Sequence, residues 1–495
     1  MVQNPAGNNS SELTTSHFTE HKDVKQCLED LMKEFGPGGK PFIVSDVVDK
    51  EGHQYVNLVQ KGGGVLGVAL VGYTYILEKM GVRFLRLAGT SAGAINTALM
   101  TVIGEKQDEK SESILRSICA LDFFKLVDGH PAARWAIKNF ITNENFGYKV
   151  KKWMRWIILI CILLFSSNII FFGLENKFPF LSLFTRVSFV LTGIYFLLIG
   201  IGIYYIVRLF KRLKNSGYGI NPGDYFYDWI KKELIANGVT TVSELKNKAG
   251  KLPDFHLRVP HIDNLDGLTG DVTFIASELV TQNKIQFPEM CYLFREAKDI
   301  DMLQPAGFIR ASMSIPVFFE SYMINDIPCT LDSIRQLWLD KMGEADPPGT
   351  ARFVDGGILS NFPINIFYNP KIMIPRLPAF GIDLDDSLPA DKTKTPTGWT
   401  LGGYMGRMFN TIRSYYDKDF LLQNKMFSKG IGKIHLSKFN WLNFFMKPEE
   451  KIEMFVLGAQ AACEFLKNFN WEEYKNNRME MHIELNKHKS QAIAE

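Results

Sequence analysis

The chain has 495 residues and a mass of 56.3 kDa, which allows one large domain with additions or two to three domains. Apolar residues make up 46% of it and charged residues 22%, so it is neither disordered nor fibrous. The formal net charge is only +3, and this balance argues against a nucleic-acid-binding protein. The six cysteines form no CxxC pair, which excludes a disulfide-stapled secreted scaffold and a cysteine-rich zinc site.

Residues 1–40 are expected to be a polar N-terminal leader. They contain no basic segment followed by an apolar run, so no cleavable signal peptide is predicted. A strand is expected over Gln54–Gln60, and the apolar spacing predicts a helix over Leu66–Met80, which Gly81 ends.

A glycine-rich loop, Gly62-Gly63-Gly64-Val65-Leu66-Gly67, joins this strand to this helix. Such a turn exposes backbone N–H groups at the positive end of a helix dipole, and it therefore favours an anion. The loop also fits the GxGxxG dinucleotide fingerprint. That interpretation is disfavoured because the next strand ends in Ala88-Gly-Thr-Ser91 and lacks the acidic residue that the fingerprint requires.

A second glycine motif, Gly89-Thr-Ser-Ala-Gly93, follows a strand expected over Val82–Ala88 and precedes a helix expected over Ala92–Ile103. A GxSxG pattern between a strand and a helix is typical of a nucleophile elbow. The small residues let the turn close and leave the serine hydroxyl exposed at the start of the helix. We therefore predict that Ser91 is a nucleophile, with Gly89 and Gly93 forming the turn.

Two apolar runs occupy the middle of the chain. Trp156–Leu174 has 19 residues without a charge and Val187–Val207 has 21. Helices of these lengths reach about 28 and 32 Å, which matches the hydrocarbon core of a bilayer. Helices buried in a soluble core usually keep a polar stripe, whereas the interruptions here are few and uncharged. We predict a transmembrane hairpin over residues 149–214, with spans at about 156–174 and 187–207.

Basic residues flank both runs: Lys149, Lys151, Lys152, Arg155, Arg208, Lys211, Arg212 and Lys214. The short connecting loop carries only Lys177 and Arg186. By the positive-inside rule the loop is translocated. We therefore expect an integral membrane protein with two spans, whose catalytic domain and both termini lie on the cytoplasmic side.

Strands and helices continue to alternate after the hairpin. Helices are expected over Phe226–Asn237 and Ile452–Phe469, and strands over Val272–Ala276, Ala351–Val354 and Ala379–Ile382. This alternation predicts an α/β fold with a mostly parallel central sheet, helices on both faces and the hairpin as an interruption. The expected organisation is a first half of the catalytic domain at 41–148, a second half at 215–390, and a C-terminal helical part and tail at 391–495.

The sequence Val354-Asp355-Gly356-Gly357 follows one of these strands. Asp-Gly-Gly alone is commonly a turn, but a nucleophilic serine needs a base, and none of the nine histidines lies in a strand-end motif. A carboxylate in an apolar, partly desolvated site can accept the serine proton. We therefore predict a Ser91–Asp355 dyad. The oxyanion hole is expected in the glycine-rich loop, at Gly62, Gly63, Gly64 and Gly67. The N–H groups of Gly63 and Gly64 would bind the oxyanion, with a contribution from Ala92 left open.

In this order, the glycine-rich loop, the GxSxG motif and Asp-Gly-Gly resemble the patatin-like phospholipase family. Other similar stretches are Ile220–Asp224, Ala311–Pro316, Gly356–Pro363 and Lys425–Leu466. The resemblance covers residues 54–148 and 218–470. There are two departures: Leu66 stands where many members carry Arg or Lys, and the hairpin is an insertion between the two halves.

The resemblance implies a serine acyl hydrolase that cleaves fatty-acyl esters of membrane lipids, most plausibly glycerophospholipids, as a phospholipase A or lysophospholipase. The expected partners are the phospholipid substrate and the bilayer, without nucleic acid. No metal or organic cofactor is expected, because acyl transfer needs only a nucleophile, a base and oxyanion donors. Two alternatives stay open: a lipid acyltransferase with the same acyl-enzyme, and a catalytically silent, membrane-tethered binding protein.

Overall fold

The computed structural model describes residues 13–131, 134–135, 138–139, 146–215, 217–260, 264–385, 404, 408, 411, 415 and 417–494. The chain divides into two units, each described by itself below. The sheet unit comprises Met1–Val127, Gly223–Pro316 and Ser321–Glu495. The hairpin unit comprises Asp128–Pro222 and Val317–Glu320.

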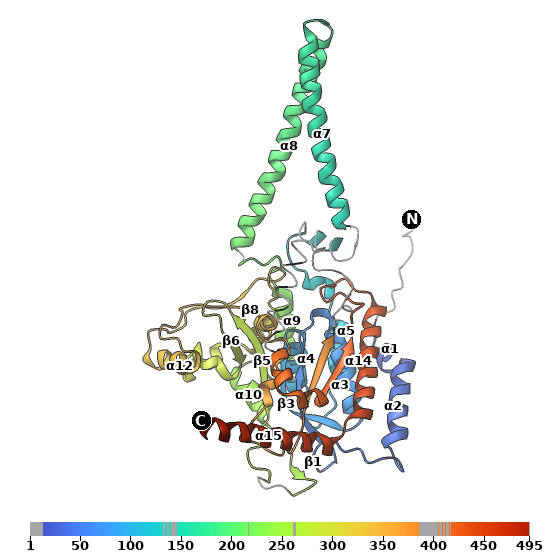
Figure 1. Cartoon of the computed structure of the whole chain (residues 1–495), viewed down its shortest axis with the longest axis vertical. Coiled ribbons are helices and arrows are strands. Elements are labelled where there is room, and N and C mark those ends of the chain that lie inside the picture. The colour runs from blue at the N-terminus through green and yellow to red at the C-terminus, as the bar shows by residue number, and fades with distance from the viewer. Residues whose placement is uncertain are drawn as a thin grey trace, which may run out of the picture. The chain divides into compact units, whose positions relative to one another are not determined.

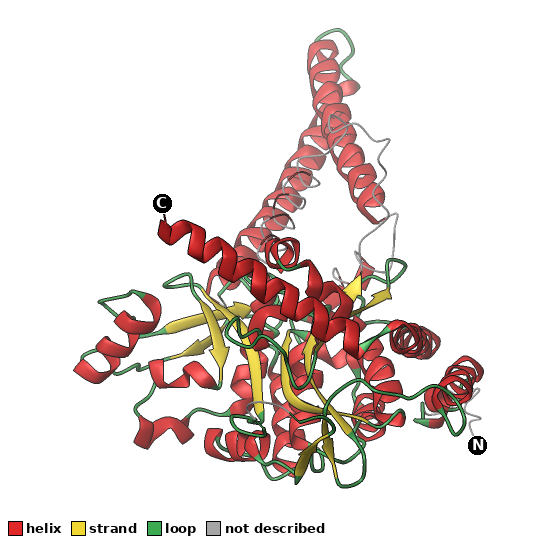
Figure 2. Ribbon diagram, turned by 60° about the horizontal axis from the view of Figure 1, so that its bottom comes forward, coloured by secondary structure: helices red, strands yellow, loops and turns green. Residues whose placement is uncertain are grey.

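A ten-stranded sheet forms the centre of the sheet unit, with the strand order β10-β9-β2-β3-β5-β8-β7 and with β1, β4 and β6 beside this path. The strands are β1 (Val47–Asp49), β2 (Gln54–Gln60), β3 (Val82–Thr90), β4 (Phe255–Leu257), β5 (Asp271–Glu278), β6 (Lys284–Phe287), β7 (Tyr322–Ile324), β8 (Ala351–Asp355), β9 (Ala379–Asp385) and β10 (Ile431–His435). Figure 2 shows them as one twisted layer flanked by helices.

The sheet is mixed. Strands β10, β9, β2, β3 and β5 run parallel, whereas β6 and β8 are antiparallel to β5, β7 is antiparallel to β8, and β1 is antiparallel to β2 and β4. The predicted α/β architecture is therefore right, but the expectation of a mostly parallel sheet is wrong. One cause is the short connection at residues 279–283, since a return to a parallel strand needs a dozen or more residues.

Helices cover the sheet. They are α1 (Ser16–Thr19), α2 (Lys22–Phe35), α3 (Gly67–Lys79), α4 (Ala92–Val102), α5 (Ser111–Ala120), α9 (Asp224–Ala236), α10 (Val242–Gly250), α11 (Pro305–Ser312), α12 (Asp332–Met342), α14 (Pro448–Asn468) and α15 (Trp471–Ala494). Short 3₁₀ turns include η1 (Gly64–Leu66), η2 (Phe123–Leu126) and η5 (Gly356–Ile358). Helix α14 packs beside α3, as Figure 1 shows. Helix α2 lies within the expected polar leader, and it buries Val24, Cys27 and Leu31.

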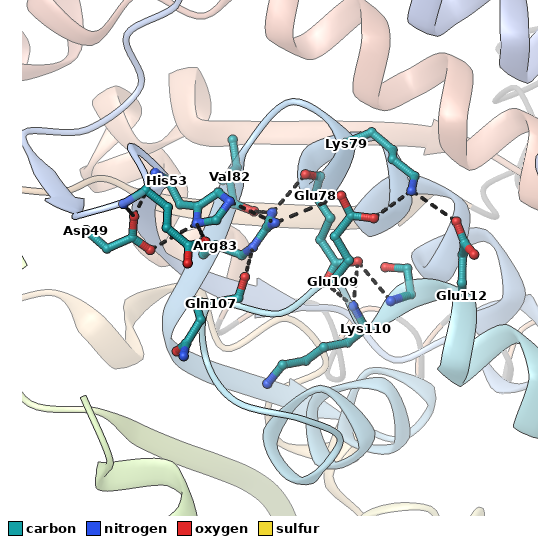
Figure 3. A network of polar contacts seen from close by, with 12 residues as sticks. Asp49, His53, Glu78, Lys79, Val82, Arg83, Gln107, Glu109, Lys110 and Glu112 are labelled. Carbon is teal, nitrogen blue, oxygen red and sulfur yellow. Dashed lines mark hydrogen bonds and ion pairs between the residues drawn. The ribbon is translucent and has the colours of Figure 1, made fainter. Parts of the chain in front are cut away.

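A polar network occupies the amino-terminal ends of β2 and β3 (Figure 3). Glu78, at the end of α3, accepts hydrogen bonds from the backbone N–H groups of Lys110 and Ser111, at 2.8 to 3.1 Å. Arg83 donates to the carbonyl oxygens of Glu78 and Gln107 at 2.8 and 2.7 Å. The network thus joins α3, β3 and the start of α5 at the amino-terminal ends of the central strands. Ser91 follows the other end of β3.

The hairpin unit contains α7 (Phe146–Glu175) and α8 (Leu181–Asn215), which lie side by side near their connecting loop (Figure 1). Lys151–Glu175 and Leu181–Lys214 are long and apolar enough to cross a membrane, with mean hydropathies of 2.6 and 2.2. Polar side chains inside the two runs pair with one another. The Ser167 and Ser188 hydroxyls lie 2.7 Å apart, and the Asn168 amide donates to the Thr192 hydroxyl at 2.8 Å.

Candidate active site

Ser91 lies in the turn between β3 and α4. Its backbone has φ 53° and ψ −120°, a conformation that is strained for any residue except glycine, and its side chain is buried. The Ser91 N–H donates to the Ser312 hydroxyl at 3.0 Å, and the Ser91 carbonyl accepts from the N–H groups of Ala94 and Ile95. These bonds hold the strained serine at the first turn of α4, as a nucleophile elbow requires.

The glycines of the elbow stand where the chain has no room for a side chain. A methyl group on Gly89 would lie 2.4 Å from the carbonyl of Gly93. One on Gly93 would lie 2.2 Å from the carbonyl oxygen of Gln60, the last residue of β2. The close approach places the start of α4 against the end of β2, next to the glycine-rich loop.

The glycine-rich loop has two amides that are not used within the fold. The Gly62 N–H donates to the Asn361 carbonyl at 3.0 Å, and the Gly67 N–H donates to the Gly64 carbonyl. Among the described residues, no acceptor lies within hydrogen-bond distance of the N–H groups of Gly63 and Gly64. These amides sit at the amino-terminal end of α3, where the helix dipole favours negative charge.

Asp355 is the last residue of β8 and is buried. Its N–H donates to the Ser314 carbonyl at 2.8 Å, and its Oδ1 accepts from the Gly357 N–H at 2.7 Å. In the sheet register, Thr90 pairs with Ile275 of β5 and Asp355 pairs with Ala276 of β5. Ser91 and Asp355 therefore flank β5 at the same level, about two strand spacings or 10 Å apart in backbone position.

One short segment holds both predicted members of the dyad. It is the end of α11 and the residues after it, where the Ser312 hydroxyl accepts from Ser91 and the Ser314 carbonyl accepts from Asp355. The sequence alone shows only that Ala311–Pro316 resembles the patatin-like family. The structure shows that it links the elbow to the end of β8.

An apolar pocket begins at the elbow and the glycine-rich loop. It has about 620 Å³ of empty space, including its open part. Its wall on α4 is formed by Ala92, Ile95, Asn96 and Leu99, and its wall at η1 and α3 by Gly64, Gly67, Val68 and Val71. Each set follows one face of a helix, so the pocket extends about 10 Å along α4, from Ala92 to Leu99. Such a shape and lining suit a hydrocarbon chain.

Within the described part of the chain, no histidine lines this pocket. His435 is the last residue of β10, and its ring lies 3.3 Å from the carboxylate of Asp385. It is nevertheless three strands from β3 in the sheet order, about 14 Å at the usual strand spacing. The described residues also contain no group of three His, Cys, Asp or Glu side chains that could hold a metal ion.

Comparison with known proteins adds a decisive finding. The family model for patatin-like phospholipases matches residues 58–368, which is more than half of the chain. The chain belongs to the patatin-like phospholipase family. The match contains the loop, the elbow and Asp355, and membership indicates hydrolysis of lipid acyl esters.

Two proteins similar to this patatin-like chain come from bacteria. The uncharacterized protein YqhO of Bacillus subtilis (strain 168) is 23% identical over 418 residues, which cover 84% of this chain and 100% of YqhO. The crystal structure of VipD from Legionella pneumophila has a TM-score of 0.35 and 12% identity, over 88% of this chain and 72% of that chain.

Several residues to which the sequence motifs gave no role also lie at this patatin-like site. The Thr90 hydroxyl donates to the Ser360 carbonyl at 3.0 Å. Asp417 accepts from the Ser360 hydroxyl and from the Phe362 N–H, both at 2.8 Å. Burial raises the pKa of Asp417, against the lowering effect of these hydrogen bonds. Asn361 falls in the stretch Gly356–Pro363 that the sequence singled out, whereas nothing in the sequence pointed to Asp417.

Proposed function

We propose that this protein is a membrane-anchored serine hydrolase that cleaves the fatty-acyl esters of glycerophospholipids through Ser91 and Asp355. The observation that carries the proposal is the apolar pocket that begins at Ala92, the residue after Ser91. Family membership gives the reaction class, and the pocket gives a place for the acyl chain. In this orientation the ester carbonyl would lie at the elbow, beside the unused amides of Gly63 and Gly64.

The reaction would proceed in two steps. The Ser91 hydroxyl oxygen attacks the carbonyl carbon while Asp355 accepts the hydroxyl proton, and the lysolipid leaves with that proton. Asp355 then accepts a proton from water as the water oxygen attacks the acyl-enzyme. When the bond to Ser91 breaks, that proton passes to the Ser91 oxygen and the fatty acid is released. In both steps the N–H groups of Gly63 and Gly64 stabilise the charge on the oxyanion.

Membrane anchoring is the second part of the proposal. The side chains of the apolar runs are exposed outward, for example Phe165 at 61% and Leu197 at 64%, while their polar groups face one another. Polar groups paired between helices and apolar groups outside are the arrangement expected in lipid. Because basic residues flank the outer ends of both apolar runs, we infer that the connecting loop is translocated and that the sheet unit stays cytoplasmic.

The test uses purified full-length protein in detergent micelles and phospholipid vesicles. Ser91→Ala and Asp355→Asn should each lower hydrolysis by about a thousandfold or more, and the double variant should be no worse than either single variant. His435→Ala is the matched control and should keep full activity. An inactive wild type that no fluorophosphonate labels at Ser91 would favour a silent binding protein. Transfer of labelled acyl groups to added lysolipid, without release of fatty acid, would indicate an acyltransferase.

A further inference from the structure

The amide oxygen of Asn361 occupies an unusual position, between the glycine-rich loop and the turn after Asp355. Asn361 is 7% exposed, and its Oδ1 is buried without a hydrogen-bond donor among the described residues. A methyl group on Gly62 would lie 2.5 Å from this oxygen and 3.0 Å from Ser91 Cβ. A methyl group on Gly357 would lie 2.4 Å from the same oxygen and 2.8 Å from Asp355 Oδ1. The side chain of Asn361 therefore fills the space between the surroundings of Ser91 and those of Asp355.

The same residue binds the glycine-rich loop at two points. Its carbonyl accepts from the Gly62 N–H at 3.0 Å, and its side-chain amide donates to the Gly62 carbonyl at 3.2 Å. Gly62 immediately precedes Gly63 and Gly64, whose N–H groups are unused. These two hydrogen bonds fix the peptide groups on either side of Gly62. Since the Gly62 carbonyl and the Gly63 N–H belong to one planar peptide group, the bonds fix the direction of the Gly63 amide and the starting point of the Gly64 amide.

Asn361 is itself held on both sides. The Thr90 hydroxyl donates to the Ser360 carbonyl. This bond joins the residue that precedes Ser91 to the residue that precedes Asn361. Asp417 binds the Ser360 hydroxyl and the Phe362 N–H, one residue to either side. These three hydrogen bonds are more than an exposed surface loop would need. Here they fix a buried segment that contacts the loop, the elbow and the turn after Asp355.

We propose that Asn361 is a positioning residue for the reaction, which holds the Gly63 and Gly64 amides in line with the oxyanion. This inference rests on the proposed function, because it assumes that these amides act on an ester bound at Ser91. An oxyanion contact is made mainly in the transition state, so its loss lowers kcat more than it raises KM. A displacement of about 1 Å in such a site can cost about a hundredfold in rate.

The experiment measures hydrolysis of a soluble short-chain p-nitrophenyl ester by the full chain in detergent micelles. Asn361→Ala should lower kcat by about 10- to 100-fold and leave KM within about twofold. The rate of fluorophosphonate labelling at Ser91 should fall in parallel, because the phosphonyl oxygen takes the place of the oxyanion. Asn57→Ala is the matched control. Asn57 on β2 is 8% exposed and its Oδ1 is also unpartnered among the described residues, but its partners in the sheet are Arg86 and Ala379, which belong to neither the glycine-rich loop nor the elbow. It should leave kcat unchanged.

The outcomes separate the two proposals. If Ser91→Ala keeps wild-type activity, the proposed function fails whatever Asn361 does. If Ser91→Ala is inactive while Asn361→Ala keeps kcat, or changes only KM, the positioning role is refuted. If Asn361→Ala does not fold by circular dichroism, Thr90→Val decides, since it removes only the hydroxyl that binds Ser360. A smaller loss of kcat at constant KM then supports the inference, and an unchanged kcat overturns it.

Discussion

Replacing Glu78 with leucine removes the only described acceptor of two buried N–H groups at the start of α5. The Glu78 carboxylate receives the Lys110 N–H and the Ser111 N–H, and these two residues are 5% and 0% exposed, so water cannot replace it. A buried donor left without a partner costs about 1–3 kcal/mol. Two donors therefore give about 2–6 kcal/mol, which the burial of the leucine side chain offsets only in part.

The assay is chemical denaturation of the full chain in detergent micelles, with the free energy of unfolding as the measured quantity. Glu112→Leu is the matched control, since Glu112 belongs to the same network but is half-exposed and pairs with Lys79 at 3.0 Å. An exposed ion pair contributes about 0–1 kcal/mol. The interpretation is refuted if Glu78→Leu costs no more than Glu112→Leu.

Glu78→Gln tests the charge separately from the acceptor. Burial raises the pKa of Glu78, although the N–H groups of Ser111 and Lys110 and the charge of Arg83 oppose that shift. Because the folded-state pKa lies above the unfolded one, the stability linked to Glu78 is fully present below the unfolded pKa and decreases as the pH rises through the folded pKa. Glutamine keeps an acceptor and does not titrate. The stability of the glutamine variant relative to wild type should therefore increase between pH 4 and pH 8, and a constant difference would contradict this explanation.

Two further predictions concern the pocket and the hairpin. Leu99→Phe should fill the far part of the pocket and lower kcat/KM for a long-chain ester by about tenfold relative to a short-chain ester, whereas Leu77→Phe, on α3 but outside the pocket lining, should leave this ratio unchanged. If the ratio of kcat/KM for the long-chain ester to that for the short-chain ester falls equally in the Leu99 and Leu77 variants, Leu99 does not contact the acyl chain. Cysteine introduced at Asn176 should react with an impermeant maleimide from the non-cytoplasmic side, and labelling from the cytoplasmic side alone would refute the predicted orientation.

The elements between residues 54 and 103 were predictable from the sequence almost residue by residue, whereas α1, α2, β1 and α5 were not predicted. Strand β2 begins and ends where the sequence predicted. Strand β3 and helix α4 begin at the predicted residue and end within two residues of the prediction, and α3 differs by one residue at each end. The reason is local: Gly81 and Gly104 have φ values of 76° and 57°, which end α3 and α4 in conformations that glycine adopts without strain. Periodicity and such turns need no knowledge of distant segments.

The direction of β8 and the environment of Asn361 depend on contacts that no local pattern encodes. Strand β8 enters antiparallel to β5, so Asp355 reaches the level of Ser91 from the opposite direction. The partners of the Asn361 segment are equally remote in sequence: Thr90 lies 270 positions from Ser360, and Gly62 lies 299 positions from Asn361. Motif order could identify the candidate nucleophile and base, but not the side chains that fix their geometry.

The hairpin is inserted into the chain between two groups of residues that line the pocket. The sheet unit ends its first segment at Val127 and resumes at Gly223. Pocket-lining residues stand close to both junctions: Phe123 and Leu126 before the first, and Phe226 and Trp229 after the second. A soluble lipid hydrolase must adsorb to a membrane before it can bind substrate. In this chain the inserted segment leaves the sheet unit after Leu126 and returns before Phe226, so the proposed anchor would keep the pocket at high effective concentration relative to a lipid substrate. The strands β3 and β8, which lead to Ser91 and end in Asp355, lie outside the inserted segment, so the proposed anchoring would leave the geometry of the dyad unchanged.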